Sequence, residues 1–160
     1  MAKEIERKFL VTGDDWRAGA DAGVAYRQGY LSAGADAACT VRVRLGGGRA
    51  FLTVKGPAAG AARDEYEYPI PPADAAEILE RLCAGGTVEK VRHHVGFAGR
   101  TWEVDVFSGA NAPLVVAEVE IEAVDAAVAL PAWVGAEVTD DPRYTNAALA
   151  RAPYSRWGRP

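Results

Sequence analysis

The sequence predicts an α+β fold in which antiparallel strands outnumber helices. Most of the chain consists of short runs in which apolar and charged residues alternate, as expected of strands with one buried face. Gly and Pro separate these runs at the spacing of hairpins, which favours antiparallel pairing. At 160 residues the chain is long enough for a substantial core, and we expect residues 1–160 to form a single domain.

The first half of the chain contains the clearest strand patterns. EIERKFLV at residues 4–11 is the first, and AYRQGYLSA at residues 25–33 is a second that ends in a loop. TVRVRLGGGRAFLTVKG at residues 40–56 predicts two strands, joined in a hairpin by the glycines at 46–48. RDEYEYPI at residues 63–70 follows, and we expect the prolines at 69, 71 and 72 to end it.

The second half begins with the best helix, PADAAEILERLCAGG at residues 72–86. Pro72 suits its first turn, and Gly85 supplies a C-terminal stop. Its apolar side is formed by Ile78, Leu79 and Leu82. Three strands are then predicted, in TVEKVRHH, RTWEVDVF and LVVAEVEIEAV at residues 87–94, 100–107 and 114–124. Two short helices complete the prediction, DAAVALPAW at residues 125–133 and YTNAALARA at residues 144–152.

Nearly every predicted strand has one ionic face and one apolar face. In the first run Glu4, Glu6 and Lys8 share a face, and the residues between them take the other. The remaining ionic faces are Arg42, Arg44; Thr53, Lys55; Arg63, Glu65, Glu67; Lys90, Arg92; Glu103, Asp105; and Glu118, Glu120, Glu122. A solvated face usually mixes charged with neutral polar residues, whereas these hold almost only acids and bases. Three glutamates in a row repel one another unless a cation lies beside them.

Two architectures agree with this pattern. In the first, an open antiparallel sheet carries helices on its apolar face and water on its ionic face. In the second, a closed or nearly closed barrel turns its ionic faces inward, where charge requires water or charged ligands. Paired acids suit a divalent cation such as Mg²⁺ or Mn²⁺, and paired basic groups suit phosphate oxygens. The barrel therefore predicts a site for a metal-bound polyphosphate.

The chain resembles the CYTH proteins, also called triphosphate tunnel metalloenzymes. Their ExExK motif is present as Glu4, Glu6 and Lys8. The agreement continues in order through QGYL, VRVR, LTVKG, EYEYPI, VEKVRHHV, WEVDVF, VAEVEIE and EVTDDPRYTN. The resemblance implies a closed eight-stranded antiparallel barrel with a charged interior and helices packed outside. It is strongest to the small single-domain bacterial branch that hydrolyses inorganic tripolyphosphate.

The resemblance also implies roles for individual residues. A divalent metal, Mg²⁺ or Mn²⁺, is expected to bind Glu4, Glu6, Asp105, Glu118 and Glu120. The phosphates are expected to contact Lys8, Arg42, Arg44, Lys55, Lys90 and Arg92. Tyr30 of QGYL is expected to act in catalysis with Lys8, whose ammonium group would lower the pKa of the phenol so that it accepts a proton from the attacking water. Further tunnel-lining acids are expected at Glu65, Glu67, Glu103 and Glu122.

The function expected from this resemblance is metal-dependent hydrolysis of tripolyphosphate to pyrophosphate and phosphate, which makes the protein a hydrolase of phosphoanhydride bonds. Two alternatives stay open. The same fold would serve an adenylate cyclase of class IV or a thiamine or nucleoside triphosphatase, and a non-catalytic module would bind polyphosphate without cleaving it. In related proteins the C-terminal helix lies at one tunnel mouth, where it would restrict substrate length.

Composition narrows the partners to small molecules. The formal net charge of −4 and the pI near 5.2 argue against nucleic acid and anionic membranes as partners. There is no signal-peptide pattern or transmembrane run, and Cys39 and Cys83 lack metal-ligand spacing, so we expect unpaired buried thiols in a cytoplasmic protein. His93 and His94 are adjacent, so they face opposite ways and are expected to end a strand. Whether the protein forms a homodimer is left open.

Overall fold

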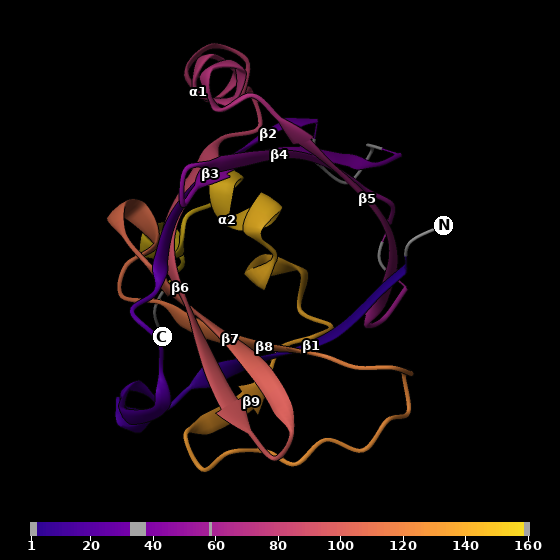
Figure 1. The fold of residues 1–160 in the computed structure, drawn as a ribbon, viewed down its shortest axis with the longest axis vertical. Coiled ribbons are helices and arrows are strands. Elements are labelled where there is room, and N and C mark those ends of the chain that lie inside the picture. Colours follow the sequence, from indigo (N-terminus) through magenta and orange to yellow (C-terminus); the bar gives the residue numbers. More distant parts are fainter. Residues whose placement is uncertain (1–2, 33–37, 58, 159–160) are drawn as a thin grey trace.

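The strands form a ring. The computed structural model describes residues 3–32, 38–57 and 59–158, and within these it contains nine antiparallel strands in one sheet. They are β1 (Lys3–Val11), β2 (Val24–Ser32), β3 (Thr40–Gly46), β4 (Arg49–Lys55), β5 (Ala62–Ile70), β6 (Thr87–Phe97), β7 (Arg100–Phe107), β8 (Val115–Glu120) and β9 (Val134–Glu137). The order is β5-β4-β3-β2-β6-β7-β8-β1-β9, and β5 also pairs with β1. This last pairing closes eight strands into a barrel, with β9 added outside (Figure 1).

β1 closes the barrel because it is long enough to pair with two neighbours. Its N-terminal end pairs with β5, which places Glu4 opposite Arg63. From Glu6 onward it pairs with β8, and there Lys8 lies opposite Glu118. Residues directly opposite in an antiparallel pair share a face. The three residues of the ExExK motif therefore lie on the inner face of the barrel, beside the ionic faces of β5 and β8.

The two α-helices lie in different places. α1 (Pro72–Arg81) packs outside β3 and β4, where Ala75 and Leu79 contact Val43 and Ala50. α2 (Asn146–Arg151) lies within the outline of the ring (Figure 1). Four 3-10 turns accompany them, η1 (Asp15–Gly19), η2 (Gly109–Asn111), η3 (Pro142–Tyr144) and η4 (Tyr154–Arg156). In the described residues, no helix is long and apolar enough to cross a bilayer.

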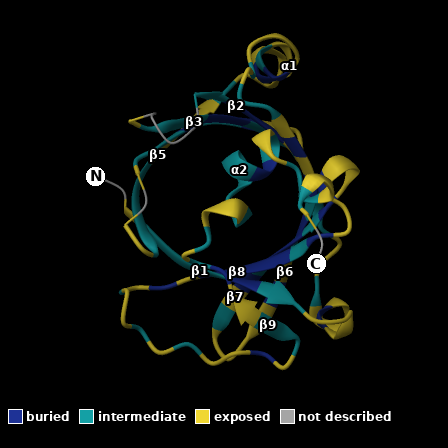
Figure 2. Ribbon diagram, turned by 180° about the vertical axis from the view of Figure 1, so that it is seen from behind, coloured by how far each residue is buried: buried dark blue, intermediate teal, exposed yellow. Residues whose placement is uncertain are grey.

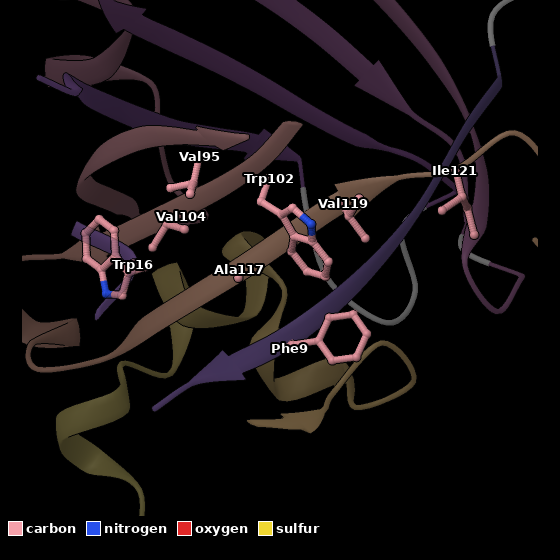
Figure 3. Packing of buried hydrophobic residues seen from close by; sticks show 8 residues of the cluster. All are labelled: Phe9, Trp16, Val95, Trp102, Val104, Ala117, Val119 and Ile121. Carbon is pink, nitrogen blue, oxygen red and sulfur yellow. The ribbon is translucent and has the colours of Figure 1, made fainter. Parts of the chain in front are cut away.

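The largest apolar cluster covers the outside of β1, β6, β7 and β8. Figure 3 shows its buried members, Phe9, Trp16, Val95, Trp102, Val104, Ala117, Val119 and Ile121. They are covered by η1 and by residues 121–134, which contribute Ala126, Val128 and Trp133. Figure 2 shows the result, in which β8 is largely buried while much of α1 is exposed. The largest part of the core is thus a layer outside the barrel wall.

The helix predicted at residues 125–133 is wrong, because this segment is irregular. Pro131 has no N–H to donate and disfavours helical geometry in the residue before it. The segment instead lays its apolar side chains over β7 and β8. It leads into β9, a four-residue strand that the sequence pattern did not predict.

Several predicted boundaries were also wrong. The predicted helix at 72–86 ends at Arg81, so Leu82 is 59% exposed and does not contribute to its apolar side. β6 continues past His93 and His94 to Phe97. β5 ends at Ile70, as predicted, although Pro69 lies within it and does not end it. Ala33, the last residue of the second predicted strand, lies outside the described residues.

The glycine hairpin was predicted correctly. β3 and β4 pair from Thr40 opposite Lys55 to Gly46 opposite Arg49. Gly47 and Gly48 form the turn, with φ angles of +62° and +74°. Both angles lie in the left-handed region that glycine adopts without steric cost and that tight hairpin turns require.

Candidate active site

The ionic faces of the strands point into the barrel, as the closed architecture predicts. Cross-strand neighbours on this face include Thr53 beside Glu67 and Arg92 beside Asp105. Five of these charged side chains are buried: Arg42, Lys90, Arg92, Asp105 and Glu118. Closure of the sheet excludes the open architecture, in which this face would be covered by water.

The C-terminal segment fills one end of the barrel. Val88, Phe107 and Val116 share the inner face with Lys90 and Asp105 and form an apolar layer, against which Leu149 of α2 packs with 0% exposure. α2 thus packs against the inner face of the barrel wall, so only α1 agrees with the expectation of helices packed outside.

Two hydrogen bonds join this segment to the ionic lining. Lys8 Nζ donates to the carbonyl oxygen of Tyr144 at 3.0 Å, and Lys90 Nζ donates to Asn146 Oδ1 at 3.1 Å. A cavity of about 350 Å³ remains between the segment and the barrel wall. The lining of this cavity includes Glu6, Lys8, Tyr30, Arg42, Lys55, Arg63 and Arg151.

One side of the lining is acidic. Lys55 Nζ lies 3.0 Å from Glu4 Oε2 and 3.8 Å from Glu65 Oε2. Burial acts to raise the pKa of Glu4, but hydrogen bonding to Glu65 and the charge of Lys55 outweigh it and lower the pKa to about 2. Burial and the hydrogen bond to Glu4 raise the pKa of Glu65 to about 7. Two carboxyl groups thus share one ammonium group, and one of the two is held ionised.

Glu6 is the least satisfied acid of the lining. Burial, together with the charges of Glu118 and Glu4, raises its pKa well above the ordinary value, and Lys8 and Lys55 offset this only in part. Within the described residues, no three acidic, histidine or cysteine side chains are already gathered closely enough to hold a metal ion. The repulsion among Glu4, Glu6 and Glu118 is nevertheless the kind that a divalent cation relieves, and their carboxylate oxygens are the donors that Mg²⁺ and Mn²⁺ prefer. The donor set therefore fits a hard divalent ion.

A second group of charges surrounds Asp105. Arg92 donates to Asp105 through Nε at 2.8 Å and through Nη2 at 2.9 Å, and Lys90 Nζ donates to it at 2.7 Å. Arg92 also contacts Glu103 at 2.8 Å and Glu118 at 3.8 Å. Both oxygens of Asp105, an expected metal ligand, are therefore engaged by two of the expected phosphate-binding cations.

Lys90 is strongly perturbed by this environment. Burial, together with the neighbouring Arg92 and Arg44, lowers its pKa to about 7, although Asp105 opposes the change. Burial acts to raise the pKa of Asp105, but the charges of Lys90 and Arg92 outweigh it, so that pKa is lowered. Asp105 is therefore the ionised centre of the group.

The opposite side of the lining is basic. Arg42 donates through Nη2 to Thr53 Oγ1 at 3.1 Å and lies 3.5 Å from Glu67, whereas its buried Nε has no hydrogen-bond partner among the described residues. Burial and the charges of Arg42 and Arg92 lower the pKa of Arg44 to about 10. Five cations, Lys8, Arg42, Lys55, Arg63 and Arg151, thus line one cavity.

Tyr30 lies in the cavity wall but lacks the expected lowered pKa. Its side chain is 3% exposed, and burial raises the pKa of the phenol above 10, with Arg42, Arg44 and Lys8 offsetting the rise in part. The charge of Lys8 does act in the direction predicted, but desolvation of the phenolate is the larger effect. The phenol is therefore protonated at neutral pH.

Glu120 and Glu122, two acids predicted for the site, are both exposed. Glu120 lies opposite Glu6 in the register but is exposed, and Glu122 lies beyond β8, where it forms an ion pair with Arg100 at 2.9 Å. Glu122 is therefore not a tunnel-lining residue. The free cysteines Cys39 and Cys83 are unpaired, as predicted, but half-buried.

Sequence reasoning assigned no role to several residues of the site. Arg151 lies on α2 and lines the cavity. An isolated arginine on a short C-terminal helix does not indicate a binding role in the sequence. Gln28 was quoted only as part of QGYL, yet it is fully buried between Tyr30 and Arg44. Arg63 was assigned to an ionic face without a role, and its register opposite Glu4 places it beside the motif.

Comparison with known proteins finds relatives that span nearly the whole chain. Residues 2–147 match the family described as the CYTH domain. An inorganic triphosphatase of Acetivibrio thermocellus is 48% identical over 157 residues, which cover 98% of this chain and 99% of that protein. An inorganic triphosphatase of Nitrosomonas europaea is 43% identical over 151 residues, which cover 92% of this chain and 96% of that protein. A crystal structure of an inorganic triphosphatase superposes with a TM-score of 0.67 at 39% identity and covers 92% of this chain and 97% of that one.

Proposed function

This chain belongs to the CYTH family, and from that premise we propose that it hydrolyses inorganic tripolyphosphate to pyrophosphate and phosphate inside its charged tunnel. Two relatives that share 43–48% of its residues over nearly their full length are inorganic triphosphatases. The observation that carries the proposal is the cavity, which is lined by Glu6 and by five cations, Lys8, Arg42, Lys55, Arg63 and Arg151. The cations suit the negative charge of a polyphosphate chain, and the glutamates suit a metal ion that accompanies it.

The basic residues of the cavity would bind the substrate. The unpartnered Nε of Arg42 can donate to a phosphate oxygen while Nη2 stays bonded to Thr53. Burial acts to lower the pKa of Lys8, but Glu118 and Glu6 outweigh it and raise the pKa, so this lysine keeps its charge. Arg63 and Arg151 would add charge at the cavity wall.

We infer that a divalent cation, Mg²⁺ or Mn²⁺, is held by Glu4, Glu6 and Glu118. When bound, such an ion supplies positive charge that offsets the substrate's phosphates and makes water a better nucleophile. Glu120 lies in register beside Glu6 and would complete the donor set from the exposed side. Asp105 would act less directly, because its ion pairs hold Arg92 against Glu118 and Lys90 against Asn146.

Domain organisation and cellular compartment are also part of the proposal. We propose that all 160 residues form one domain, since α2 and the turn after it pack into the barrel wall. Two unpaired, half-buried cysteines suit a reducing compartment, and we propose the cytoplasm.

The proposal is tested by phosphate release from tripolyphosphate, ATP, thiamine triphosphate and pyrophosphate, each with Mg²⁺, with Mn²⁺ and with EDTA. We expect metal-dependent release that is fastest from tripolyphosphate. Faster release from ATP or thiamine triphosphate would assign the site to a different triphosphate. Tight tripolyphosphate binding without release from any substrate would identify a binding module and overturn the proposed reaction.

A further inference from the structure

Gln28 connects the basic wall of the tunnel to Tyr30. Its side chain is 0% exposed and lies on the inner face of β2, two residues before the tyrosine. Arg44 Nε donates to Gln28 Oε1 at 3.1 Å, and Gln28 Nε2 lies 2.8 Å from the hydroxyl oxygen of Tyr30. Arg44 in turn stacks on the ring of Tyr26 at 5.0 Å, which fixes its position.

The chemistry of these three groups sets the direction of each hydrogen bond. A guanidinium group has only donors, so the amide oxygen of Gln28 must face Arg44 and its nitrogen must face Tyr30. The amide N–H therefore donates and the Tyr30 oxygen accepts. The hydroxyl hydrogen of Tyr30 is left to point elsewhere.

The described part of the chain offers no acceptor for that hydrogen. Among the described residues, none accepts a hydrogen bond from the Tyr30 hydroxyl, although the side chain lines the cavity. The charges acting on the phenol are those of Arg42, Arg44 and Lys8, all of which are donors. The acceptor is therefore a group that enters the cavity, either water or a ligand, and the phosphate oxygens of a bound polyphosphate are acceptors.

We propose that Gln28 is a positioning residue that holds Tyr30 as a hydrogen-bond donor to a phosphoryl oxygen of the bound tripolyphosphate. This rests on the proposed function and refines it, because it replaces the expected role of Tyr30 as acceptor of a proton from water. Burial, which keeps the phenol protonated at neutral pH, supports the same direction. Tyr30 would contact the substrate, and Gln28 would act through it.

The test compares two substitutions that affect the hydrogen bonds differently. Q28E keeps the size of the side chain and both contacts, but its carboxylate only accepts, so it turns the Tyr30 hydrogen away from the cavity. Q28M removes both contacts and leaves that hydrogen free. We expect kcat for tripolyphosphate to fall roughly 100-fold in Q28E and in Y30F, as for the loss of one donor to a developing oxyanion, and less than tenfold in Q28M. A merely structural role for Gln28 gives the reverse order, with Q28M worse than Q28E.

The double variant separates hydrogen-bond direction from charge. Q28E also places a negative charge near the phosphates, and that effect persists when Tyr30 is replaced. In the Y30F background we therefore expect Q28E to cost only a few-fold more. If the loss of kcat in the double variant equals the product of the losses in Q28E and Y30F, the two residues act independently and the proposal is overturned. A wild-type rate in either single variant also overturns it.

Two controls make the result decisive. Circular dichroism and thermal unfolding establish that each variant is folded. If Q28E does not fold, Q28M and Y30F decide the matter: we expect a measurable loss of kcat in Q28M that stays below tenfold, and a roughly 100-fold loss in Y30F. An unchanged kcat in Q28M, or a larger loss in Q28M than in Y30F, overturns the inference. Phosphate release by the wild-type chain is measured first. An inactive wild type overturns the proposed function and this inference together, whereas an active wild type matched by Q28E overturns the inference alone.

Discussion

At the scale of single residues, the tunnel lining is held in two charge states by its neighbours. Asp105 is ionised by Lys90 and Arg92, which contact it at 2.7–2.9 Å. Glu6 has burial and two like charges against it, and its pKa is raised. A buried ion pair such as that of Asp105 costs more free energy to break than it adds in net stability. A buried carboxylate beside like charges, such as that of Glu6, destabilises the fold until a cation binds.

The raised pKa values predict how stability depends on pH. Between the ordinary glutamate pKa, 4.5, and about 7, folded Glu65 binds more protons than the unfolded chain, and Glu6 acts in the same sense. Metal-free protein should therefore lose stability as pH rises through this window. The lowered pKa of Glu4 affects stability only at lower pH, between about 2 and 4.5, where stability falls as the pH falls.

Thermal unfolding at pH 5 and pH 7, with EDTA and with Mg²⁺, measures this effect, since above about pH 7 the lowered pKa of Lys90 acts in the opposite sense. We expect a lower Tm at pH 7 than at pH 5 in EDTA, and a larger stabilisation by Mg²⁺ at pH 7, because the ion binds only ionised carboxylates. E6Q should weaken both effects. A Tm in EDTA that rises from pH 5 to pH 7 would contradict the account.

Arg42 should contribute to substrate binding through its unpartnered Nε. R42K keeps the charge but loses the planar set of donors, so we expect KM for tripolyphosphate to rise about tenfold or more, in line with the 1.5–3 kcal/mol typical of a hydrogen bond to a charged group. Steady-state kinetics measure this change. R81K on the exposed surface of α1 is the matched control and should leave KM unchanged. Equal KM values for R42K and wild type would remove Arg42 from the substrate site.

At the scale of elements, alternation predicted all the barrel strands but not what covers them. The ionic and apolar faces of β1, β3, β4, β6, β7 and β8 were readable because charged and apolar residues alternate along these strands. The outer face of β5 instead exposes Tyr66 and Tyr68, and no ionic face was predicted for β2. The structure of residues 121–134 could not be predicted in this way, because their apolar residues cover the barrel wall without a regular spacing in sequence. β9 was missed because four residues are too few to show alternation. The reach of α2 into the barrel depends on contacts distant in sequence, such as that between Asn146 and Lys90.

Leu149 tests the packing of α2 in the barrel end. L149A removes a fully buried side chain from a layer formed by Val88, Phe107, Leu114 and Val116. We expect a loss of about 2–5 kcal/mol in the free energy of unfolding, measured in urea. L130A, at a leucine that is 49% exposed, is the control and should change little. A loss below roughly 0.5 kcal/mol in L149A would show that α2 does not pack there.

Removal of the residues after Arg143 tests whether this end limits the substrate. The truncation deletes Asn146 and Leu149, and with them the contact to Lys90 and the apolar layer. We expect a lower Tm and faster cleavage of polyphosphates longer than three units relative to tripolyphosphate. Unchanged stability together with an unchanged chain-length profile would contradict a limiting role.

At the scale of the whole molecule, closure is what turns a set of ionic strand faces into a site. Alternation alone could not decide closure, because an open sheet and a barrel require the same pattern in every strand. The family resemblance decided it at the sequence level, and the pairing of β1 with both β5 and β8 confirms it. The pKa of Tyr30 could not be predicted from its neighbours in sequence, because burial inside the closed barrel outweighs the charge of Lys8.

The central claim is that a metal held by the glutamates of this tunnel is required to hydrolyse tripolyphosphate. The most direct measurement is phosphate release across a Mg²⁺ titration by wild type, E6Q and the surface control E80Q. We expect wild type and E80Q to show the same metal-dependent rate. E6Q should lose at least about 100-fold in kcat yet keep its fold, because the Glu6 carboxylate repels its neighbours rather than packing against them. A wild-type rate in E6Q at every Mg²⁺ concentration, or an undiminished rate of the wild type in EDTA, would contradict the claim.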